Sequence, residues 1–378
     1  MMSTASAIDF YLERVFTFDR QFHYPSYLTT PTAEHTNRVL LVRSGEYVVR
    51  ALLVEDGPMK KALLLALAVI AVGCTDLVPG NVDELLFQSE AAAEPSLTDF
   101  RKKVLLIGLD GVRPDVLAEV ETPNIDALID QGAFSASART SYPSVSGPGW
   151  SSMLIGVWPE KHGVTNNDFE NKHYDVYPDF LTRIESIRPE LNTFAVSDWL
   201  PIVANDHNGP IIGEAPDVKH ILDGYELGWA EADDRSVELA VEHLRSRDPD
   251  AMFVYLGNPD ETSHLFRSIG EEYRDAIAQS DEHVGQLMAA VRARPTYPQE
   301  DWLILMSTDH GRTRDGGHGG DTPEERTIFY LASGPSTVVG ILEGTPSIVD
   351  VPVTAMVHLG IDIDPAWALD GEVVGLSR

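Results

Sequence analysis

The chain has 378 residues, of which 43% are hydrophobic and 23% are charged, a composition typical of a globular protein. This composition excludes an intrinsically disordered chain, a collagen-like fibre and a membrane protein with several spans. The net charge of −31 repels phosphate backbones, so we do not expect the chain to bind a nucleic acid duplex. With a single cysteine, the chain can form neither an intrachain disulfide framework nor a cysteine-based zinc cluster.

The first 73 residues differ from the rest of the chain in charge. They contain 7 basic and 7 acidic residues, so the whole negative excess lies in residues 74–378. Near the end of this segment, Met59-Lys60-Lys61 precedes an apolar run from Ala62 to Val72, which is the pattern of a secretory signal peptide. A helix over this run would rise only ~16 Å, about half of the hydrocarbon core of a bilayer. We therefore expect residues 59–73 to be a signal peptide and not a transmembrane span.

The residues at the end of the apolar run resemble a bacterial lipobox. In Ala71-Val72-Gly73-Cys74 the cysteine would be acylated after cleavage, although Ala71 stands where leucine is usual. We expect Met59 to be the true start, residues 1–58 to be a mistranslated or disordered leader, and residues 75–100 to be an acidic linker. The protein would then be exported to the periplasm or cell envelope and held to the membrane only by a lipid anchor. The alternative is an uncleaved buried helix with Cys74 in the core.

Residues 101–378 alternate between apolar and amphipathic segments, and they are predicted to form a single catalytic domain. Near-continuous apolar runs, typical of strands buried on both faces of a parallel sheet, lie at 103–109, 193–197, 251–257, 302–307 and 327–332. Helical patterns lie between and after them at 124–131, 231–246, 270–293 and 349–359. This order predicts an α/β fold, a three-layer α/β/α sandwich with a central, mainly parallel sheet.

A segment at about 199–230 interrupts this alternation. It is rich in Pro, Gly, Asp and Trp and has no clear period, so we predict a short cap insertion over the substrate pocket. Trp199, Tyr225 and Trp229 are its candidate stacking residues, although packing is the more ordinary role of each ring. A short cap favours small or exposed substrates.

Three Asp and three His residues follow predicted strands closely, and they are Asp110, Asp260, His264, Asp309, His310 and His318. Parallel strands place their carboxyl ends at one edge of the sheet, where the chemistry of α/β proteins gathers. Asp and His ligands without Cys fit catalytic zinc or manganese better than a structural zinc site. Six ligands are too many for one tetrahedral ion but suit two ions that share a substrate.

Each of these residues also has an ordinary structural interpretation. Asp110 and Asp309 fit turns, and Asp260 fits a helix cap. The convergence of all six on one edge is what favours a metal site. We expect the other nine histidines to be structural, among them His162, His207 and His358.

The stretch 142–156 (YPSVSGPGWSSMLIG) predicts a turn that leads into a helix. Pro148 suits the first helical turn, which places Ser146 beside the helix N-terminus, where the dipole favours an alkoxide or a phosphoryl oxyanion. A serine hydroxyl needs activation, and a bound metal supplies it. No Gly-x-Ser-x-Gly motif surrounds Ser146, so a Ser-His-Asp hydrolase would need another arrangement. Ser144, Ser151 and Ser152 are rival nucleophiles at this stage.

The ordered set of motifs resembles the alkaline phosphatase superfamily, and within it the nucleotide pyrophosphatase/phosphodiesterase group. The resemblance covers about residues 103–378. The motifs that carry it are residues 106–115 (LIGLDGVRPD), the Ser146 loop, residues 156–164 (GVWPEKHGV), Pro259-Asp260-x-x-x-His264, residues 308–311 (TDHG) and His318.

The resemblance implies a two-zinc site with manganese as an alternative. Asp260, His264 and His318 would hold one zinc, and Asp110, Asp309 and His310 the other, with the Ser146 oxygen as its fourth ligand. Ser146 would attack phosphorus and form a phosphoseryl intermediate on a small phosphorylated substrate.

Two positions depart from the pattern of this group. Ser146 stands where threonine is usual, and Gly149 stands where an asparagine usually binds a phosphate oxygen. Asn166 or Asn167 is the candidate replacement for that asparagine, and Asn167 is the one we select for substrate binding. Diester and monoester substrates therefore remain open, as does the oligomeric state.

The main function predicted is that of a phosphodiesterase or nucleotide pyrophosphatase. A phosphomonoesterase or a phosphonate hydrolase would use the same metals. A sulfatase is the nearest rival of another kind, but Trp150 stands where its Cys/Ser-x-Pro-x-Arg motif has arginine, and three histidines argue against a calcium site. The alternative outside the enzymes is an inactive metal-binding surface lipoprotein.

Overall fold

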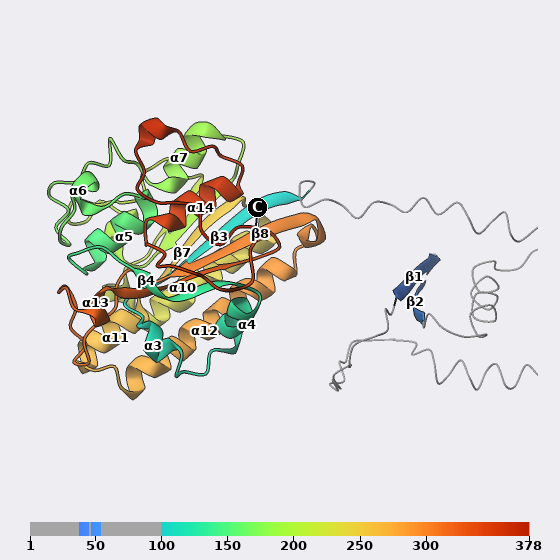
Figure 1. Cartoon of the computed structure of the whole chain (residues 1–378), viewed down its shortest axis with the longest axis horizontal. Coiled ribbons are helices and arrows are strands. Elements are labelled where there is room, and N and C mark those ends of the chain that lie inside the picture. The colour runs from blue at the N-terminus through green and yellow to red at the C-terminus, as the bar shows by residue number, and fades with distance from the viewer. Residues whose placement is uncertain (1–37, 45–46, 54–99, 378) are drawn as a thin grey trace, which may run out of the picture. The chain divides into compact units, whose positions relative to one another are not determined.

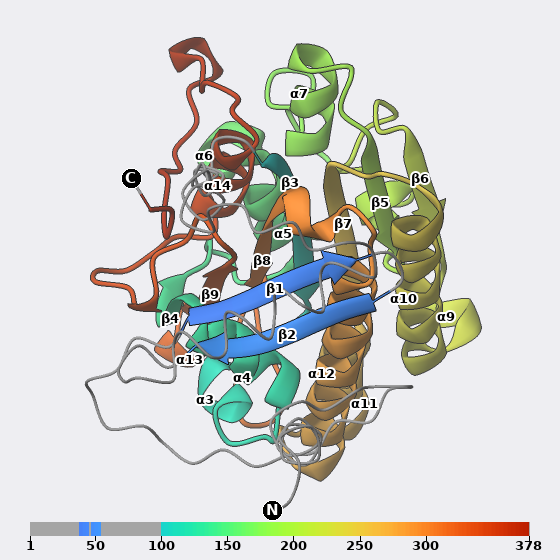
Figure 2. The same cartoon turned by 90° about the vertical axis from the view of Figure 1, so that its right-hand side faces the viewer.

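The computed structural model describes residues 38–44, 47–53 and 100–377 of a chain that divides into two units, Met1–Ala92 and Ala93–Arg378. In the first unit, strands β1 (Arg38–Ser44) and β2 (Tyr47–Leu53) pair antiparallel (Figure 2). These strands lie within the segment 1–58. The predicted signal peptide, Cys74 and the linker up to residue 99 fall outside the described residues.

An eight-stranded sheet with the order β10-β4-β9-β8-β3-β7-β5-β6 forms the centre of the second unit. Its strands are β3 (Arg101–Leu109), β4 (Gly132–Arg139), β5 (Thr193–Ser197), β6 (Val218–Ile221), β7 (Ala251–Leu256), β8 (Glu300–Ser307), β9 (Thr327–Ser333) and β10 (Gly340–Ile341). All neighbours pair in parallel except β9, which is antiparallel to β4 and to β8. The predicted central, mainly parallel sheet is confirmed.

Helices cover both faces of this sheet and complete the three layers (Figure 1). One face carries α5 (Ser146–Ile155), α6 (Pro159–His162), α7 (Phe180–Ile187) and α14 (Asp350–His358). The other carries α3 (Pro114–Leu117), α4 (Pro123–Asp130), α10 (Trp229–Ser246) and α12 (Glu271–Arg292). The short helices α8 (Leu200–Val203), α9 (Gly224–Leu227), α11 (Asn258–Phe266) and α13 (Pro323–Arg326) lie in the connections, with 3-10 turns at Tyr297–Gln299 and Pro365–Trp367.

The alternation of side chains along β3 explains its continuous apolar run. Val104 and Leu106 point into the core under α5, α7 and α14, whereas Leu105 and Ile107 point into the core under α4, α10 and α12. All four are fully buried. A strand covered on both faces needs apolar residues at every position, which is why the predicted strand coincides with the observed one.

The segment 199–230 is only partly an insertion. Its residues Val218–Ile221 form β6, which pairs in parallel with β5 at the edge of the central sheet. The remainder forms α8, α9 and loops at the carboxyl ends of the strands, and it places Trp199 and Tyr225 at a pocket.

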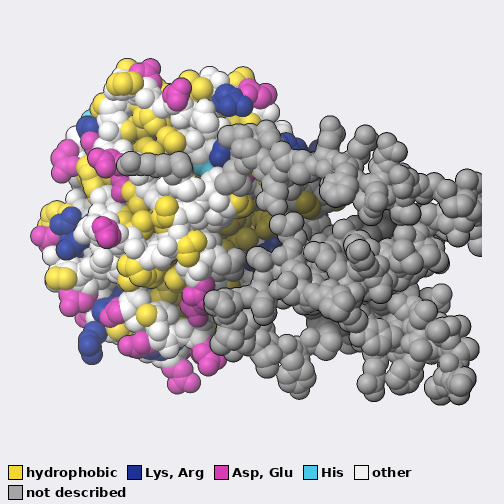
Figure 3. All heavy atoms as spheres, turned by 45° about the vertical axis from the view of Figure 1, so that its right-hand side comes forward, with side chains coloured by type: hydrophobic (Ala, Val, Ile, Leu, Met, Phe, Trp, Pro, Cys, Tyr) yellow, Lys and Arg dark blue, Asp and Glu magenta, His cyan; other side chains and the backbone are white. Residues whose placement is uncertain are grey.

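The second unit carries many more acidic than basic side chains. On the face shown in Figure 3, acidic side chains are scattered over the surface and basic ones lie among them. Among the described residues, no helix is long and apolar enough to cross a bilayer.

Candidate active site

The residues expected at the carboxyl edge of the sheet converge there. Asp110 directly follows β3, and Asp309 and His310 follow β8 after one further residue. Asp260 and His264 lie one turn apart on α11, which begins directly after β7 and Gly257. His318 reaches the same place from the loop before α13, so the parallel strands bring together six side chains from four parts of the sequence.

Asp110, Asp309 and His310 form the first group of candidate metal ligands. His310 Nε2 lies 3.5 Å from Asp110 Oδ1 and 3.3 Å from Asp309 Oδ2. Both of these carboxylate oxygens are buried and have no hydrogen-bond partner among the described residues. Burial and the Asp110 carboxylate together raise the pKa of Asp309 well above its usual value. Two buried carboxylates that face one another repel, and either a proton or a bound cation between them offsets the repulsion.

Two aromatic side chains orient Asp110 by occupying its other oxygen. Trp150 Nε1 donates to Asp110 Oδ2 at 2.9 Å, and the Tyr255 hydroxyl donates to the same atom at 2.6 Å. Burial, with the Asp110 carboxylate as the next cause, raises the pKa of Tyr255 far above its usual value, so the hydroxyl keeps its proton. A Cβ at Gly108 would lie 2.3 Å from the Trp150 ring, so only glycine lets the indole reach Asp110. The two donors leave Oδ1 free to bind a metal.

Asp260, His310 and His318 form the second group of candidate metal ligands, so His310 belongs to both groups, and His264 lies beside this group at the mouth of the site. His264 Nε2 lies 2.9 Å from His318 Nε2 and 3.1 Å from Asp260 Oδ2. His310 joins the two groups. Its ring stacks on the His318 ring with 3.7 Å between centroids, and its Nε2 lies 3.8 Å from Asp260 Oδ1. The structure therefore assembles all six predicted ligands in two adjoining clusters.

Hydrogen bonds fix the tautomers of two of these histidines. The Nδ1 atoms of His310 and His318 lie 2.9 Å from the carbonyl oxygens of Gly311 and Ser144, so each Nδ1 carries the proton and donates it. Burial lowers the pKa of both imidazoles, so both rings are neutral. Each Nε2 then presents a lone pair to the cluster, as a metal ligand requires.

Ser146 is the serine that faces these clusters. It is the first residue of α5, and its Oγ lies 3.3 Å from His310 Nε2. The three rival hydroxyls each donate a hydrogen bond to a backbone carbonyl. Ser144 donates to Gly320, and Ser151 and Ser152 donate to carbonyls one turn earlier in α5. Of the four serines, only Ser146 lines the pocket.

Comparison with known proteins agrees with this arrangement. The sequence profile of the family described as type I phosphodiesterase / nucleotide pyrophosphatase matches residues 104–215 and 192–315, more than half of the chain. The chain belongs to this family. Ectonucleotide pyrophosphatase/phosphodiesterase family member 7 of Rattus norvegicus is 23% identical over 56% of this chain and 50% of its own length. A bis(5'-adenosyl)-triphosphatase of Bos taurus is 23% identical over 68% of this chain and 53% of its own length. The chain thus spans about half the length of these relatives.

Solved structures support the fold. One is murine ectonucleotide pyrophosphatase/phosphodiesterase 5, solved as an inactive threonine-to-alanine variant in complex with AMP. It aligns with a TM-score of 0.55 at 14% identity, and the alignment covers 70% of this chain and 96% of the murine chain. The phosphonate monoester hydrolase of Agrobacterium radiobacter aligns with a TM-score of 0.55 at 17% identity, over 72% of this chain and 76% of its own. These structures show the fold, and the family profile confirms the predicted resemblance to the nucleotide pyrophosphatase/phosphodiesterase group.

Asn167 lines the same pocket as Ser146 and contacts the residue that follows it. The Asn167 Oδ1 atom accepts a hydrogen bond from the backbone N–H of Gly147 at 2.7 Å. The side-chain nitrogen of Asn167 therefore points away from that N–H group. A Cβ at Gly149 would lie 2.9 Å from the Asp309 carbonyl oxygen, so the backbone leaves no room for the asparagine usual at this position. A separate loop therefore brings an asparagine to the nucleophile.

Arg312, which the sequence analysis did not select, is buried against the second cluster. Its guanidinium donates to Asp260 Oδ1, to the Gly111 carbonyl at 2.9 Å and to the Gly316 carbonyl at 3.1 Å. Burial lowers the pKa of Arg312 to about 10, and at neutral pH the side chain stays charged. The salt bridge and two backbone contacts connect the Asp260 carboxylate, a candidate metal ligand, to the loop that carries His318.

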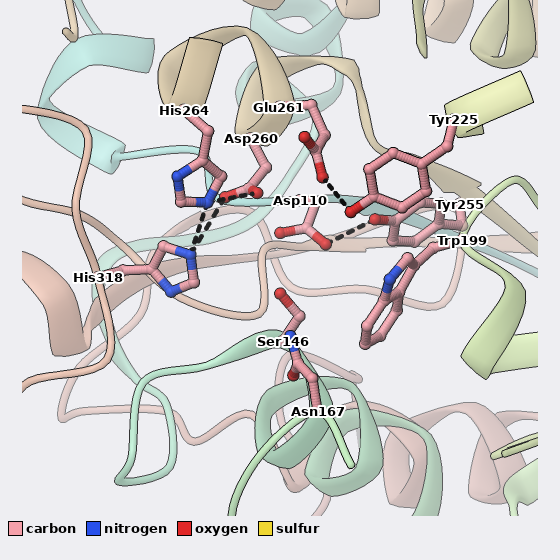
Figure 4. A pocket seen from close by; sticks show the side chains of 10 residues that line it. All are labelled: Asp110, Ser146, Asn167, Trp199, Tyr225, Tyr255, Asp260, Glu261, His264 and His318. Carbon is pink, nitrogen blue, oxygen red and sulfur yellow. Dashed lines mark hydrogen bonds and ion pairs between the residues drawn. The ribbon is translucent and has the colours of Figure 1, made fainter. Parts of the chain in front are cut away.

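A pocket of about 300 Å³ opens above both clusters (Figure 4). Its lining residues are Asp110, Ser146, Asn167, Trp199, Tyr225, Tyr255, Asp260, Glu261, His264 and His318. His264 and His318 lie at one end, and Tyr225, Glu261 and Trp199 lie at the other. Sequence reasoning missed Tyr255 and Glu261, because a buried strand residue and a helix glutamate carry no motif of their own.

Two of the histidines expected to be structural, His162 and His358, are buried in hydrogen-bonded positions outside the pocket. His162 is buried, its Nε2 lies 3.1 Å from the Ser152 hydroxyl, and burial lowers its pKa to about 3. His358 Nε2 donates to the Asp301 carbonyl at 2.9 Å. His207 is largely exposed and lies outside the pocket.

Asp and His donors of this kind fit a metal centre. The two unpaired carboxylate oxygens, the fixed Nε2 lone pairs and the absence of a thiolate among the described site residues match the ligands of catalytic zinc or manganese.

Proposed function

We propose that the chain is a metal-dependent phosphodiesterase that cleaves small phosphodiesters through a phosphoseryl intermediate on Ser146. The observation that carries this proposal is the position of Ser146. Its hydroxyl starts helix α5, lies 3.3 Å from His310 Nε2 and faces two buried carboxylate oxygens that lack partners among the described residues. The family of the chain and its relatives in the pyrophosphatase/phosphodiesterase group support the reaction class.

Two divalent cations, zinc or manganese, are proposed as cofactors. Asp110, Asp309 and His310, with the Ser146 oxygen, would hold one, and the other would be held by Asp260, His264 and His318. When bound, such ions lower the pKa of a hydroxyl or a water and offset the charge on the phosphoryl group.

The reaction has two steps, and the protein's own residues act in both. Ser146 loses its proton, its oxygen attacks phosphorus, and the bond from phosphorus to the leaving alcohol breaks as that alcohol takes up a proton. The positive end of the α5 dipole and the Asn167 amide would stabilise the phosphoryl oxygens. Water then attacks the phosphoseryl ester, gives its proton to the Ser146 oxygen and releases the phosphomonoester product. Trp150 and Tyr255 hold Asp110 in place throughout.

The test is hydrolysis of bis(p-nitrophenyl) phosphate against p-nitrophenyl phosphate by zinc-loaded protein. We expect the diester to be cleaved faster, with the activity lost in Ser146→Ala and retained in Ser186→Ala, which removes a hydroxyl from α7. Faster cleavage of the monoester would instead identify a phosphatase on the same fold. The two departures from the family pattern, Ser146 in place of threonine and Gly149 in place of asparagine, make that outcome the second candidate.

The cell-envelope location is a proposal of the same kind. It rests on Lys60, Lys61 and the apolar run that ends before Cys74, and on a charge excess confined to residues 74–378. We propose that translation starts at Met59 and that Cys74 is acylated after cleavage.

A further inference from the structure

Helix α11, which carries Asp260 and His264, has no capping side chain of its own. Buried backbone N–H groups at the start of a helix need acceptors from elsewhere. Asp233 on α10 supplies them, because its Oδ1 accepts from the Gly257 N–H at 2.8 Å and its Oδ2 accepts from the Asn258 N–H at 3.2 Å. A buried carboxylate on a neighbouring helix thus caps the helix that presents two candidate metal ligands.

Packing holds the same point of the chain. Trp229 lies one turn before Asp233 on α10, and a Cβ at Gly257 would lie 2.6 Å from the Trp229 ring. Only glycine therefore lets the backbone come this close to α10. The ring and the carboxylate together fix the start of α11 against α10.

A second buried acid supports the cap. Asp198 directly follows β5, is 1% exposed, and accepts no hydrogen bond from the described residues at either carboxylate oxygen. Burial, with the Asp233 carboxylate as the next cause, raises the pKa of Asp198 well above its usual value, so Asp198 keeps a proton at neutral pH. Burial also raises the pKa of Asp233, but the hydrogen bond from Asp198 opposes that shift, so Asp233 is the member of the pair that ionises first. Asp198 can then donate its proton to the carboxylate that the two N–H groups require.

We propose that Asp233 is a positioning residue for the metal site and that Asp198 holds it in place. Asp233 fixes the start of α11, so that the two ligands on this helix meet His318 around one ion. This inference rests on the proposed function, because it assigns the residues that support the ligands of that ion. Neither acid lines the pocket, so their effect passes through the orientation of α11 and not through contact with the substrate.

The test measures zinc binding without substrate, by competition with a chromophoric chelator. In Asp233→Ala we expect the affinity for one of the two zinc ions to fall about 10–100-fold, as is usual when a residue behind a metal ligand is lost. Asp281→Ala is the matched control. Asp281 is a buried acid on α12 that caps α4 in the same way, because it accepts from the N–H groups of Asn124 at 3.0 Å and Ile125 at 2.7 Å. Asp281→Ala should lower the Tm by a similar amount and leave the zinc affinity unchanged.

Two variants at position 198 test the supporting contact. An amide donates a hydrogen bond without a bound proton, so Asp198→Asn should keep the zinc affinity within about 3-fold of the wild type. Asp198→Ala removes the donor and should lower that affinity about 10-fold. An equal loss in the two variants would overturn the part assigned to Asp198.

Hydrogen exchange tests the cap without any metal. Asp233→Asn keeps one acceptor oxygen, and it should speed exchange in the peptide that contains Gly257 and Asn258 but not in the peptide that contains Asn124 and Ile125.

Unchanged exchange at the start of α11, unchanged zinc affinity in Asp233→Ala, or an equal loss of zinc affinity in Asp281→Ala would overturn the inference. A wild-type protein that shows the expected zinc binding and exchange but cleaves no phosphodiester would support the inference and refute the phosphodiesterase.

Discussion

Replacing Tyr255 by Phe removes one of the two donors that hold Asp110 Oδ2 and changes little else. The hydroxyl donates at 2.6 Å to a carboxylate oxygen in a fully buried site, while the ring packs on Trp150 at 5.0 Å between centroids. A hydrogen bond to a charged group contributes about 1.5–3 kcal/mol. Trp150 still donates to the same oxygen, so we expect Asp110 to stay in place but to bind metal less well.

The assay measures kcat/KM for bis(p-nitrophenyl) phosphate and the zinc affinity by competition with a chromophoric chelator. We expect both to fall about 10–100-fold in Tyr255→Phe, as is usual when a residue that supports a metal ligand is lost. Tyr330→Phe is the matched control, because the Tyr330 hydroxyl is equally buried but donates to the Val374 carbonyl, remote from the metal ligands. Wild-type zinc affinity in Tyr255→Phe, or an equal loss in Tyr330→Phe, would refute this account of how Asp110 is oriented.

Three other predictions address a salt bridge, a buried acid and the lipid anchor. Arg312→Met should lower zinc content and kcat/KM by about 10-fold or more, because Asp260 loses a charged donor, whereas Arg235→Met on α10 should change neither. Burial raises the pKa of Asp233 to about 6, so its folded form holds a proton more tightly than the unfolded chain and stability should fall as pH rises from about 4 to about 6. Asp233→Asn should remove about 1–3 kcal/mol of that pH dependence, measured by urea unfolding at pH 4.5 and pH 7.5, and an unchanged dependence would contradict the assignment. Intact-mass analysis of protein from native membranes should find an acylated N-terminus at Cys74, and a peptide from residues 1–58 would contradict it.

The strands that could be predicted are the ones buried on both faces. The run TFAVS coincides with β5, and the predicted 251–257 ends one residue beyond β7. Strand β4 was not predicted, because its sequence GAFSASAR is made of small residues, is partly exposed and shifts register against β9 between Ser135 and Ala138. Strand β6 has the sequence VKHI and lies at the sheet edge, so it carries no apolar run. The two-residue β10 has no sequence signal at all.

The site could be predicted where the backbone topology determines it. Residues that follow parallel strands must meet at one edge, so Asp110 and Asp309 could be placed at the same edge from the sequence, whereas their pairing on one ion came only from the family resemblance. The contacts of Trp150 and Tyr255 with Asp110 depend on side-chain packing across the sheet, and no local pattern encodes them. Arg312 looks like an exposed loop residue in the sequence, and only the folded loop shows that it is buried against Asp260.

The covalent intermediate is the most direct test of the central claim. Zinc-loaded protein would be mixed with bis(p-nitrophenyl) phosphate, quenched in acid within milliseconds to seconds, digested and analysed by mass spectrometry. We expect a p-nitrophenyl phosphoryl group on the peptide that contains Ser146, and neither an adduct nor turnover in Ser146→Ala. An adduct on another residue, or full turnover in Ser146→Ala, would contradict the assignment of Ser146 as the nucleophile.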